Sequence, residues 1–530
     1  MPFTLAPSAL LSLTLAYSPT DAGDAPAAPT AALPPRDTPE PDGGHFSYRR
    51  AALELGGLLA VGAAWYEAQI DFNRQDFDFD RTLDSQWQKL IGGRGFRFDD
   101  NDRSTNIAHA FVGRTYHGLA RTNHATMLQA FLFDLTASSL WEAGIENREV
   151  FSINDTVVTA VGGVPLGEAS FQIGELFARS APTWRNRLML ALFSPARAFL
   201  SLTEGERQPH ARELDRHGLA DDATHRFVLS TGGTFAAGPP PAGAPAATSG
   251  ASDGISGTFV ARLDLELINL RAYGREGKTV RSLAGGEATA LALSYAGSPE
   301  RLDQLTVAAR TSLFGTFKQD LTGNADEARG HSLLLAAGSA FDLALAEGER
   351  TPDFLTAVHM IGPTADALLY RGPMTVRLSG DVYGDFAMVR PFALGPDTPV
   401  SVLDGAKSVL RERQYYYALG LTAAARAEAR YRGVRAGAAF EWGGYASVEG
   451  LDRQQDSYLS PAGVYHAGVT DDFAITDQRF KLRVYTELPT PIDELRLGLS
   501  LDMQRRSGEM KDLTRSDDEG RAAAVLSFVL

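Results

Sequence analysis

Three ionisable side chains in the first third of the chain have the types that acid–base chemistry requires. They are His109, Glu142 and Asp155, and each lies in or beside an apolar stretch. A histidine can accept a proton near neutral pH, and a nearby carboxylate can orient it or carry the proton onward. If the fold brings the three together, we expect a hydrolytic site with His109 as base or ligand and the two carboxylates as its acidic partners.

Side chains that would bind a ligand around such a site occupy the same stretch, with Arg121 suited to hold an anion. The candidate binding residues are Asn106, Tyr116, Arg121, Asn123, Trp141, Glu146, Asn154 and Glu168. A buried structural network gives the same list, because buried charges also need partners. The chain lacks a His-Glu-x-x-His motif and a phosphate-binding glycine loop, which favours the network over catalysis.

Composition removes several classes of chemistry. Cysteine is absent, so a thiolate nucleophile, a zinc–thiolate site and an iron–sulfur cluster are excluded. We expect no metal site and no cofactor. The net charge of −15 is spread along the chain without a basic stripe, which excludes nucleic acid as a partner.

Apolar residues three and four apart predict helices through this region, as in the spacing of Leu128, Leu132 and Leu135. Glu142 and Glu146 then lie one turn apart on the same helix face. Ser152-Ile153-Asn154-Asp155 precedes an apolar run, which predicts a helix with Ser152 as its N-cap and an acid at its positive end. These segments form an expected helical domain over residues 45–221.

The order of these motifs resembles a bacterial family known as domain of unknown function 3943. The elements that recur are Asp99-Asp100-Asn101, Thr105-Asn106-Ile107-Ala108-His109, Gly113, Tyr116, Ala120-Arg121-Thr122-Asn123, Ser139-Leu140-Trp141-Glu142, Glu146, Ser152-Ile153-Asn154-Asp155, Gly162-Gly163 and Gly167-Glu168. The resemblance covers Phe98 to about Leu202. The chain departs from the family at Ala110, His124 and Phe151, where a Pro, a Gly and a Pro are usual. The resemblance implies an envelope protein, often with a strand-rich C-terminal part, and assigns no activity.

The second half of the chain repeats an alternation of apolar and polar residues closed by turns. Leu495, Leu497, Leu499, Leu501 and Met503 share one face, whereas Arg496, Ser500 and Asp502 share the other. A period of two is that of a β-strand, and strands of ten or more residues with charges on one face are typical of outer-membrane barrels. A soluble β-sandwich or lipocalin-like barrel also alternates, but its strands are shorter and fewer.

We therefore expect an α+β multidomain chain, with an N-terminal α-helical domain followed by an antiparallel transmembrane β-barrel of about 12 strands. Residues 1–27 read as a signal-like segment. Residues 28–44 are rich in Pro and Ala and form an expected disordered linker. The barrel would occupy residues 222–530.

A barrel of this kind implies the outer membrane of a Gram-negative bacterium, with membrane lipid as a partner and a periplasmic protein as a further one. The helical domain would then lie in the periplasm or fill the barrel lumen as a plug. Two functions fit. The first is a structural or pore-forming envelope protein, and the alternative is an envelope hydrolase acting on lipid or cell-wall material through the His/carboxylate site.

Overall fold

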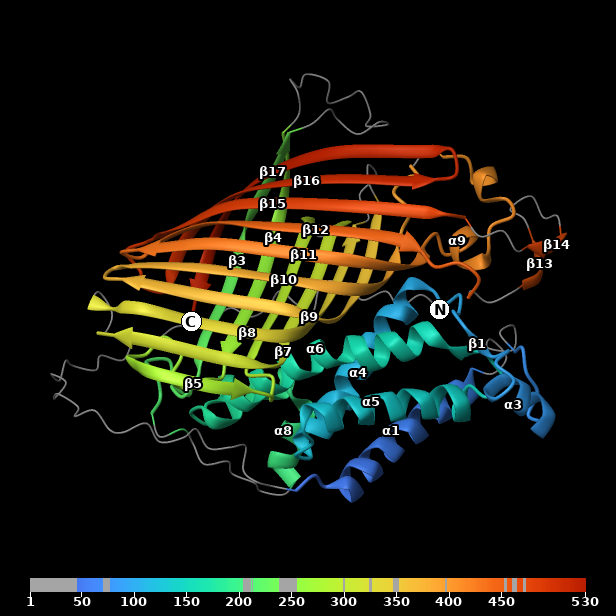
Figure 1. Ribbon diagram of the computed structural model, residues 1–530, viewed down its shortest axis with the longest axis horizontal. Helices are drawn as coiled ribbons and strands as arrows, with labels where there is room; N and C mark the ends of the chain where they lie inside the picture. The colour runs from blue at the N-terminus through green and yellow to red at the C-terminus, as the bar shows by residue number, and fades with distance from the viewer. Residues whose placement is uncertain are drawn as a thin grey trace.

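The chain folds as a β-barrel with a layer of helices along one side, as the computed structural model in Figure 1 shows. The structure describes residues 45–69, 77–203, 211, 213–237, 255–298, 301–323, 327–346, 352–395, 398–451, 455–459, 465–469 and 473–530. The expected signal-like segment and linker lie outside these residues.

The helices are concentrated before residue 204. In chain order the elements are α1 (Tyr48–Ala68), α3 (Leu83–Leu90), β1 (Phe96–Arg97), α4 (Arg103–Thr122), α5 (Met127–Leu140), the π-helical turn η3 (Trp141–Ile145), β2 (Phe151–Ser152), α6 (Ile153–Arg179), α7 (Trp184–Phe193) and α8 (Pro195–Thr203). The predicted N-cap is confirmed, because the Ser152 hydroxyl accepts the backbone N–H of Asp155 at the start of α6. Among the residues described, no helix is long and apolar enough to cross a membrane.

The strands form one large antiparallel sheet. They are β3 (Thr224–Ala237), β4 (Ile255–Ile268), β5 (Gly277–Leu283), β6 (Ala288–Ser298), β7 (Arg301–Thr322), β8 (Arg329–Ala346), β9 (Asp353–Arg371), β10 (Met374–Val389), β11 (Tyr416–Tyr431), β12 (Val434–Ser447), β15 (Ile475–Pro489), β16 (Leu495–Met510) and β17 (Leu513–Val529). A separate hairpin, β13 (Gln455–Leu459) with β14 (Tyr465–Val469), and the short helices η6 (Val400–Leu403) and α9 (Ser408–Arg411) lie in connections.

The sheet closes on itself. Its pairing order runs β7, β6, β4, β3, β17, β16, β15, β12, β11, β10, β9, β8, and β8 pairs back with β7. This makes a closed barrel of twelve strands, as expected. The short β5 pairs with the second half of β7, beside β6, and lies outside the ring. Residues 353–371 form the single strand β9, whose pairing with β8 shifts register near Gly338.

The barrel wall is apolar outside and charged inside. On β16, Leu497, Leu499 and Leu501 are exposed on the outer face. Asp502, on the opposite face, contacts Arg483 and reaches Arg262 from β4. Because backbone groups pair around the whole ring, no strand edge of the ring is left open, as membrane spanning requires.

The two ends of the barrel differ. At one end tight turns join β9 to β10, at Gly372-Pro373, and β11 to β12, at Arg432-Gly433, although residues 269–287 with β5 also lie at this end. Both Arg432 and Gly433 have positive φ, 47° and 82°, which suits a two-residue hairpin turn. At the other end a two-residue turn joins β16 to β17, but this end also carries the two longest connections, residues 390–415 and 448–474. We call these the turn end and the loop end.

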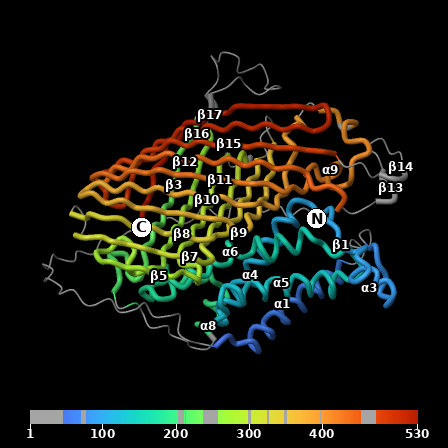
Figure 2. The backbone as a smooth tube through the Cα atoms, in the orientation of Figure 1, coloured from blue at the N-terminus to red at the C-terminus, as the bar shows by residue number. Residues whose placement is uncertain are grey.

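The helices cover the outside of the barrel. Central α6 residues Val158 and Leu166 share a core with Phe341 and Val358, which alternate with the lumen-facing Asp342 and His359. Nearer its C-terminus, α6 packs on Phe227 of β3 and Leu267 of β4. Figures 1 and 2 show α4 and α6 next to the barrel, with α5 and α1 farther out. The helices described therefore do not fill the lumen, so the expectation of a plug was wrong.

Candidate functional site

His109 and Asp155 come together between α4 and α6. His109 Nε2 lies 3.5 Å from Asp155 Oδ1, and His109 Nδ1 lies 3.3 Å from Thr159 Oγ1. Asp155 also accepts hydrogen bonds from the side chains of Asn101 and Asn154. The hydroxyl, the imidazole and the carboxylate thus have the arrangement of a catalytic triad, in which the imidazole lies between the nucleophile and the acid. The Thr159 hydroxyl is buried, however, and the Thr159 carbonyl packs against Gly113, so a substrate has no access to it.

Glu142 lies apart from this pair. It sits in the π-helical turn η3 and accepts the backbone N–H of Ser152 at 2.9 Å. No hydrogen bond or ion pair joins Glu142 to His109 in the described part of the chain. The structure therefore brings together two of the three residues proposed to be catalytic and places the third at a neighbouring helix end.

Lys89, which the sequence analysis did not single out, completes the surroundings of Glu142. Lys89 is fully buried and donates to the carbonyl oxygens of Glu142 at 2.7 Å and Glu146 at 2.8 Å, which would otherwise end the helix unpaired. Burial lowers the pKa of Lys89, and the charges of Glu142, Glu146 and Glu149 oppose that shift. Burial raises the pKa of Glu142 and Glu146, and nearby carboxylates add to it.

A second polar cluster lies between the C-terminal end of α4 and the middle of α6, and it is almost completely buried. Glu168 receives a bidentate pair from Arg121, at 2.7 and 3.0 Å, and contacts His117 Nε2 at 3.1 Å. His117 Nδ1 lies 2.8 Å from Asp134, so both ring nitrogens face carboxylates. Arg121 and Gln172 also donate to the carbonyl oxygen of Gly285, between β5 and β6. The cluster joins α4, α5 and α6 to the barrel.

Asn106 and Asn154 make a matching junction at the loop end. Asn154 Nδ2 donates to Asn106 Oδ1 at 3.3 Å, and Asn106 Nδ2 donates to the Tyr415 hydroxyl at 2.7 Å. The Tyr417 hydroxyl, from β11, donates to the carbonyl oxygen of Asp99 at 2.6 Å. These bonds fix the N-terminal ends of α4 and α6 to the rim of the barrel.

The remaining candidate residues have packing roles. Tyr116 is buried with Leu55 and Ala137. Asn123 follows α4 and donates to the Glu54 carboxylate at 2.7 Å. The Trp141 ring lies against Gly62 of α1, where an added Cβ would be 2.5 Å from it. Glu146 is hydrogen-bonded to the Trp141 side chain. The described residues contain no group of three or more His, Asp or Glu placed to hold a metal ion.

Charged pairs cross the barrel lumen. Arg377 of β10 contacts Glu266 of β4, although β9, β8, β7 and β6 separate these strands around the ring. Nearer the loop end, Arg506 of β16 lies 2.6 Å from Asp353 of β9, which also pairs with Arg479 at 2.8 Å. The alternation in the sequence predicts charges on one face of the barrel strands, but it carries no signal for which pairs bridge the lumen, because the partners are far apart in the chain.

A cavity with a volume of about 660 Å³ lies inside the barrel at the turn end. Its charged lining consists of Arg226, Arg275, Arg377, Arg430, Arg435, Arg496, Glu266, Glu428 and Glu487. Six arginines against three glutamates give the lining an excess of positive charge. We call this cavity the vestibule.

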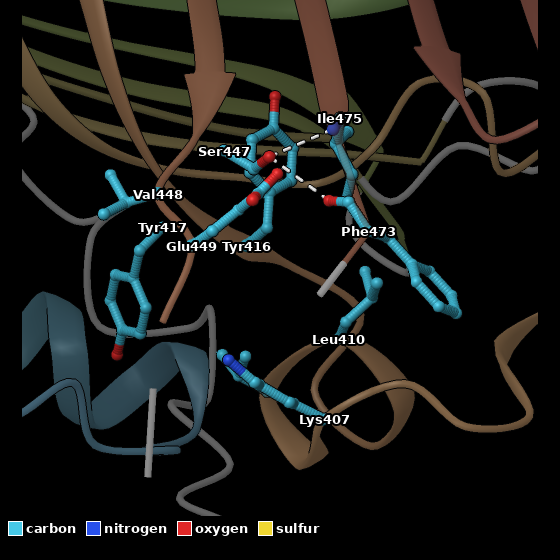
Figure 3. Close-up of a pocket in the computed structure, with 10 residues that line it drawn as sticks. Lys407, Leu410, Tyr416, Tyr417, Ser447, Val448, Glu449, Phe473 and Ile475 are labelled. Carbon is cyan, nitrogen blue, oxygen red and sulfur yellow. Dashed lines mark hydrogen bonds between the residues drawn. The ribbon is translucent and has the colours of Figure 1, made fainter. Parts of the chain in front are cut away.

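A smaller pocket of about 30 Å³ lies at the loop end, between the segment around Lys407 and the ends of β11 and β12 (Figure 3). In it the Ser447 hydroxyl donates to the Phe473 carbonyl at 3.2 Å and accepts the N–H of Ile475 at 3.0 Å. A space of this size holds a water molecule and no solute.

Comparison with known families identifies the helical part. Residues 95–196 match the family described as "Domain of unknown function (DUF3943)". These residues form a DUF3943 domain. The match confirms the resemblance seen in the motifs and begins at the strand β1, so the domain covers α4 to α7. No curated protein matches the chain.

Several solved outer-membrane channels share a low similarity with this chain. The outer membrane channel DcaP of Acinetobacter baumannii is 10% identical, with 60% of this chain and 100% of that chain covered and a TM-score of 0.19. OmpF of Salmonella typhi is 7% identical, with 58% and 98% covered and a TM-score of 0.18. The TodX monoaromatic hydrocarbon channel is 10% identical, with 58% and 90% covered and a TM-score of 0.20. Closure of the present barrel rests on its own strand pairing.

The protein is thus an outer-membrane-type β-barrel that carries a DUF3943 domain on its outer wall. The polar residues of the domain mostly face one another or the barrel rim. The lumen, by contrast, combines charged groups with a cavity that can hold water and a small solute.

Proposed function

We propose that the barrel is an outer-membrane conduit for small charged solutes, with a preference for anions. The observation that carries this proposal is the vestibule, a cavity of about 660 Å³ inside the ring in which arginines outnumber glutamates. Charged side chains are costly to bury in a dry interior, so a lumen lined with them favours a hydrated passage over a filled core. Arginine side chains there would draw anions from solution and repel cations.

The orientation follows from the two barrel ends. Short turns mark the periplasmic end of outer-membrane barrels and longer loops mark the outer end. We therefore place the vestibule at the periplasmic mouth and the connections at residues 390–415 and 448–474 outside the cell. Membrane lipid would surround the exposed apolar band of the barrel, which includes Leu419 and Leu499.

The ion pairs that cross the lumen set the size of the passage. Arg377 with Glu266, and Arg506 with Asp353, tie opposite walls together, so larger solutes would need these contacts to open. Inorganic anions and small carboxylates could exchange with the paired carboxylates along the arginines. We expect low conductance compared with a wide water-filled pore.

Conductance of the purified full-length protein in planar lipid bilayers tests the proposal. In a KCl gradient we expect a reversal potential of the sign that chloride selectivity gives. Arg430→Glu, in the vestibule lining, should move that potential toward cation selectivity. Arg505→Glu, at an exposed position near the loop end of β16, serves as a matched control and should not. A bilayer with protein that conducts no more than a bilayer without it would overturn the proposal.

An envelope hydrolase is the second candidate, because His109 is partly exposed and pairs with Asp155. We rank it lower, since Glu142 does not reach His109 and the nearby Thr159 hydroxyl is buried. The test is release of fatty acid from lipid vesicles, or of soluble fragments from cell-wall sacculi, by the purified protein. Release that is lost in His109→Ala would establish the hydrolase, and no release would remove it.

A further inference from the structure

The DUF3943 domain and α1 lie beside the barrel at the level that lipid would occupy. The helix α6 spans 27 residues, which corresponds to about 40 Å, somewhat more than the hydrocarbon thickness of about 30 Å. Near its start it is tied to the loop-end rim through Tyr415, and near its end it packs on Phe227 at the turn end. The domain thus extends over the whole height of the barrel wall.

The surface of the helices that faces away from the barrel is apolar. Exposed large apolar residues occur on four helices: Leu53, Val61 and Trp65 on α1; Leu128, Leu132 and Leu140 on α5; Trp184, Leu188 and Leu192 on α7; Phe199 and Leu202 on α8. Several are more than 60% exposed, among them Leu53 at 79% and Leu128 at 67%. Soluble domains rarely expose apolar side chains in such number on adjoining helices.

The interior of the same helices holds buried polar and charged side chains among its apolar ones. His117, Asp134 and Glu168 are fully buried between α4, α5 and α6, and Asn106 and Asn154 are buried nearer the rim. Polar bonds between helices, together with close approach of small residues, hold helices together where no water is expelled on association. Small residues also bring two of these helices close together, because Gly113 of α4 lies against Thr159 and Gly163 of α6.

Charges on the outward face are confined to the two levels of the barrel ends. The α1 segment from Leu55 to Tyr66 carries none, while Arg49 and Arg50 precede it and Glu67 follows it. Tryptophans also mark both levels, with Trp65 toward the loop end and Trp184 at the turn end. Aromatic residues and charges at two levels with an apolar band between them are typical of membrane proteins.

We propose that the outward face of α1, α5, α7 and α8 contacts the acyl chains of the outer membrane, so that the helices form a lipid-embedded layer beside the barrel. Lipid is expected on this face because the face is continuous with the outer wall of the barrel, on which Leu335 and Ile361 are also exposed. The inference rests on the membrane placement in the proposed function, and it replaces the periplasmic location expected from the sequence.

Site-directed spin labelling tests the inference in the full-length protein, because the chain contains no cysteine to be removed. The labelled variants are Leu132→Cys on α5, Leu499→Cys on the outer barrel face, and Ser500→Cys on the lumen face. Each is reconstituted in phosphatidylcholine vesicles after its heat-modifiable gel migration confirms a folded barrel. Collision with dissolved oxygen reports lipid, and collision with a charged chromium oxalate complex reports water.

We expect the label at Leu132 to match the label at Leu499, with high oxygen access and chromium access roughly tenfold below that of a label in water, since a charged complex is excluded from hydrocarbon. Chromium access at Leu132 as high as in water, with Leu499 lipid-like, overturns the inference and leaves the barrel in the membrane. Low access to both reagents at Leu132 would indicate a second copy of the chain on this face and also overturns it. Chromium access at Leu499 overturns the membrane placement itself.

Discussion

The barrel lumen and the interior of the DUF3943 domain both hold charged side chains behind an apolar exterior, and the lumen also surrounds a cavity of about 660 Å³. In the domain, His117, Asp134 and Glu168 have no exposed surface. In the lumen, the side chains of Arg377 and Glu266 beside the vestibule are 20% and 25% exposed, whereas those of Arg479 and Asp477 nearer the loop end are buried. The same residue types therefore occur in two settings: buried pairs join the helices, and the partly exposed pairs beside the vestibule would line the proposed passage.

The difference between the two regions predicts different costs of losing one charge. Removing one partner of a dry pair leaves an uncompensated charge, whereas water can solvate the partner left in a wet one. The two regions also differ in the bonds that stabilise them. Backbone hydrogen bonds around the ring stabilise the barrel, whereas side chains bind the helices to one another and to the barrel wall.

The largest expected effect is that of Glu168→Ala. It leaves Arg121 and His117 buried without their shared carboxylate, at a cost of about 3–5 kcal/mol, and we expect the helices to unfold or detach while the barrel persists. Thermal unfolding followed by helical circular dichroism, together with limited proteolysis, measures the loss. Arg185→Ala, at an exposed position of α7, is the control. If Glu168→Ala lost no more stability than Arg185→Ala, water would have to reach the cluster around Glu168.

The second prediction concerns the crossing of α4 and α6. A Cβ at Gly113 would lie 1.9 Å from the Thr159 carbonyl oxygen, so Gly113→Ala must push the helices apart, at about 1–3 kcal/mol. Gly118, five residues later on α4, has open space where its Cβ would be, and Gly118→Ala should be neutral or gain up to about 1 kcal/mol from helix propensity. The pair is compared by thermal unfolding of the helical signal. Equal stability of the two variants would contradict the close crossing.

The sequence carried the local features of both regions. The alternation at Leu495–Met503 predicted a strand with a charged inner face, and Ser152 was predicted as an N-cap. Both follow from neighbours in the chain, so short-range rules suffice. Continuity of the strand β9 is harder to predict, because Gly362 and Pro363 interrupt its alternation and pairing with β8 and β10 keeps it continuous.

The long-range arrangement could not be predicted in the same way. His117 and Asp134 escaped notice because a lone histidine and a lone aspartate in apolar helices carry no motif, and Lys89 reads as a surface lysine in the polar segment Leu83–Leu90. The helices were expected in the lumen or the periplasm, since the sequence does not record which wall face an apolar helix meets. Polar residues within apolar helices are the sequence feature that agrees with the lipid-facing layer proposed above.

The third prediction examines the loop-end cluster around Glu142, where burial raises the pKa. In the unfolded chain the Glu142 carboxyl loses its proton near the usual pKa of 4.5, whereas in the folded chain it keeps the proton to higher pH. The folded state therefore loses stability as the pH rises from 4.5 toward the raised pKa. Glu142→Gln keeps an acceptor for Ser152 but cannot ionise. Relative to the parent, the variant should gain about 1 kcal/mol for each pH unit in that window and nothing below it. Unfolding at a series of pH values measures this gain, and Glu509→Gln at an exposed position is the control. A constant difference at all pH values would contradict it.

The smallest effect on stability should come from Arg377→Ala in the lumen. Glu266 and Asp366, which Arg377 contacts, remain next to the vestibule and can be solvated there, so we expect a loss of no more than about 1 kcal/mol, as for other partly exposed pairs. The same change removes a contact between opposite walls and leaves two carboxylates without their arginine, which should raise conductance and shift selectivity toward cations. A loss as large as that of Glu168→Ala, without a change in conductance, would mean that the lumen is as dry as the helical interior and that its ion pairs hold the barrel shut.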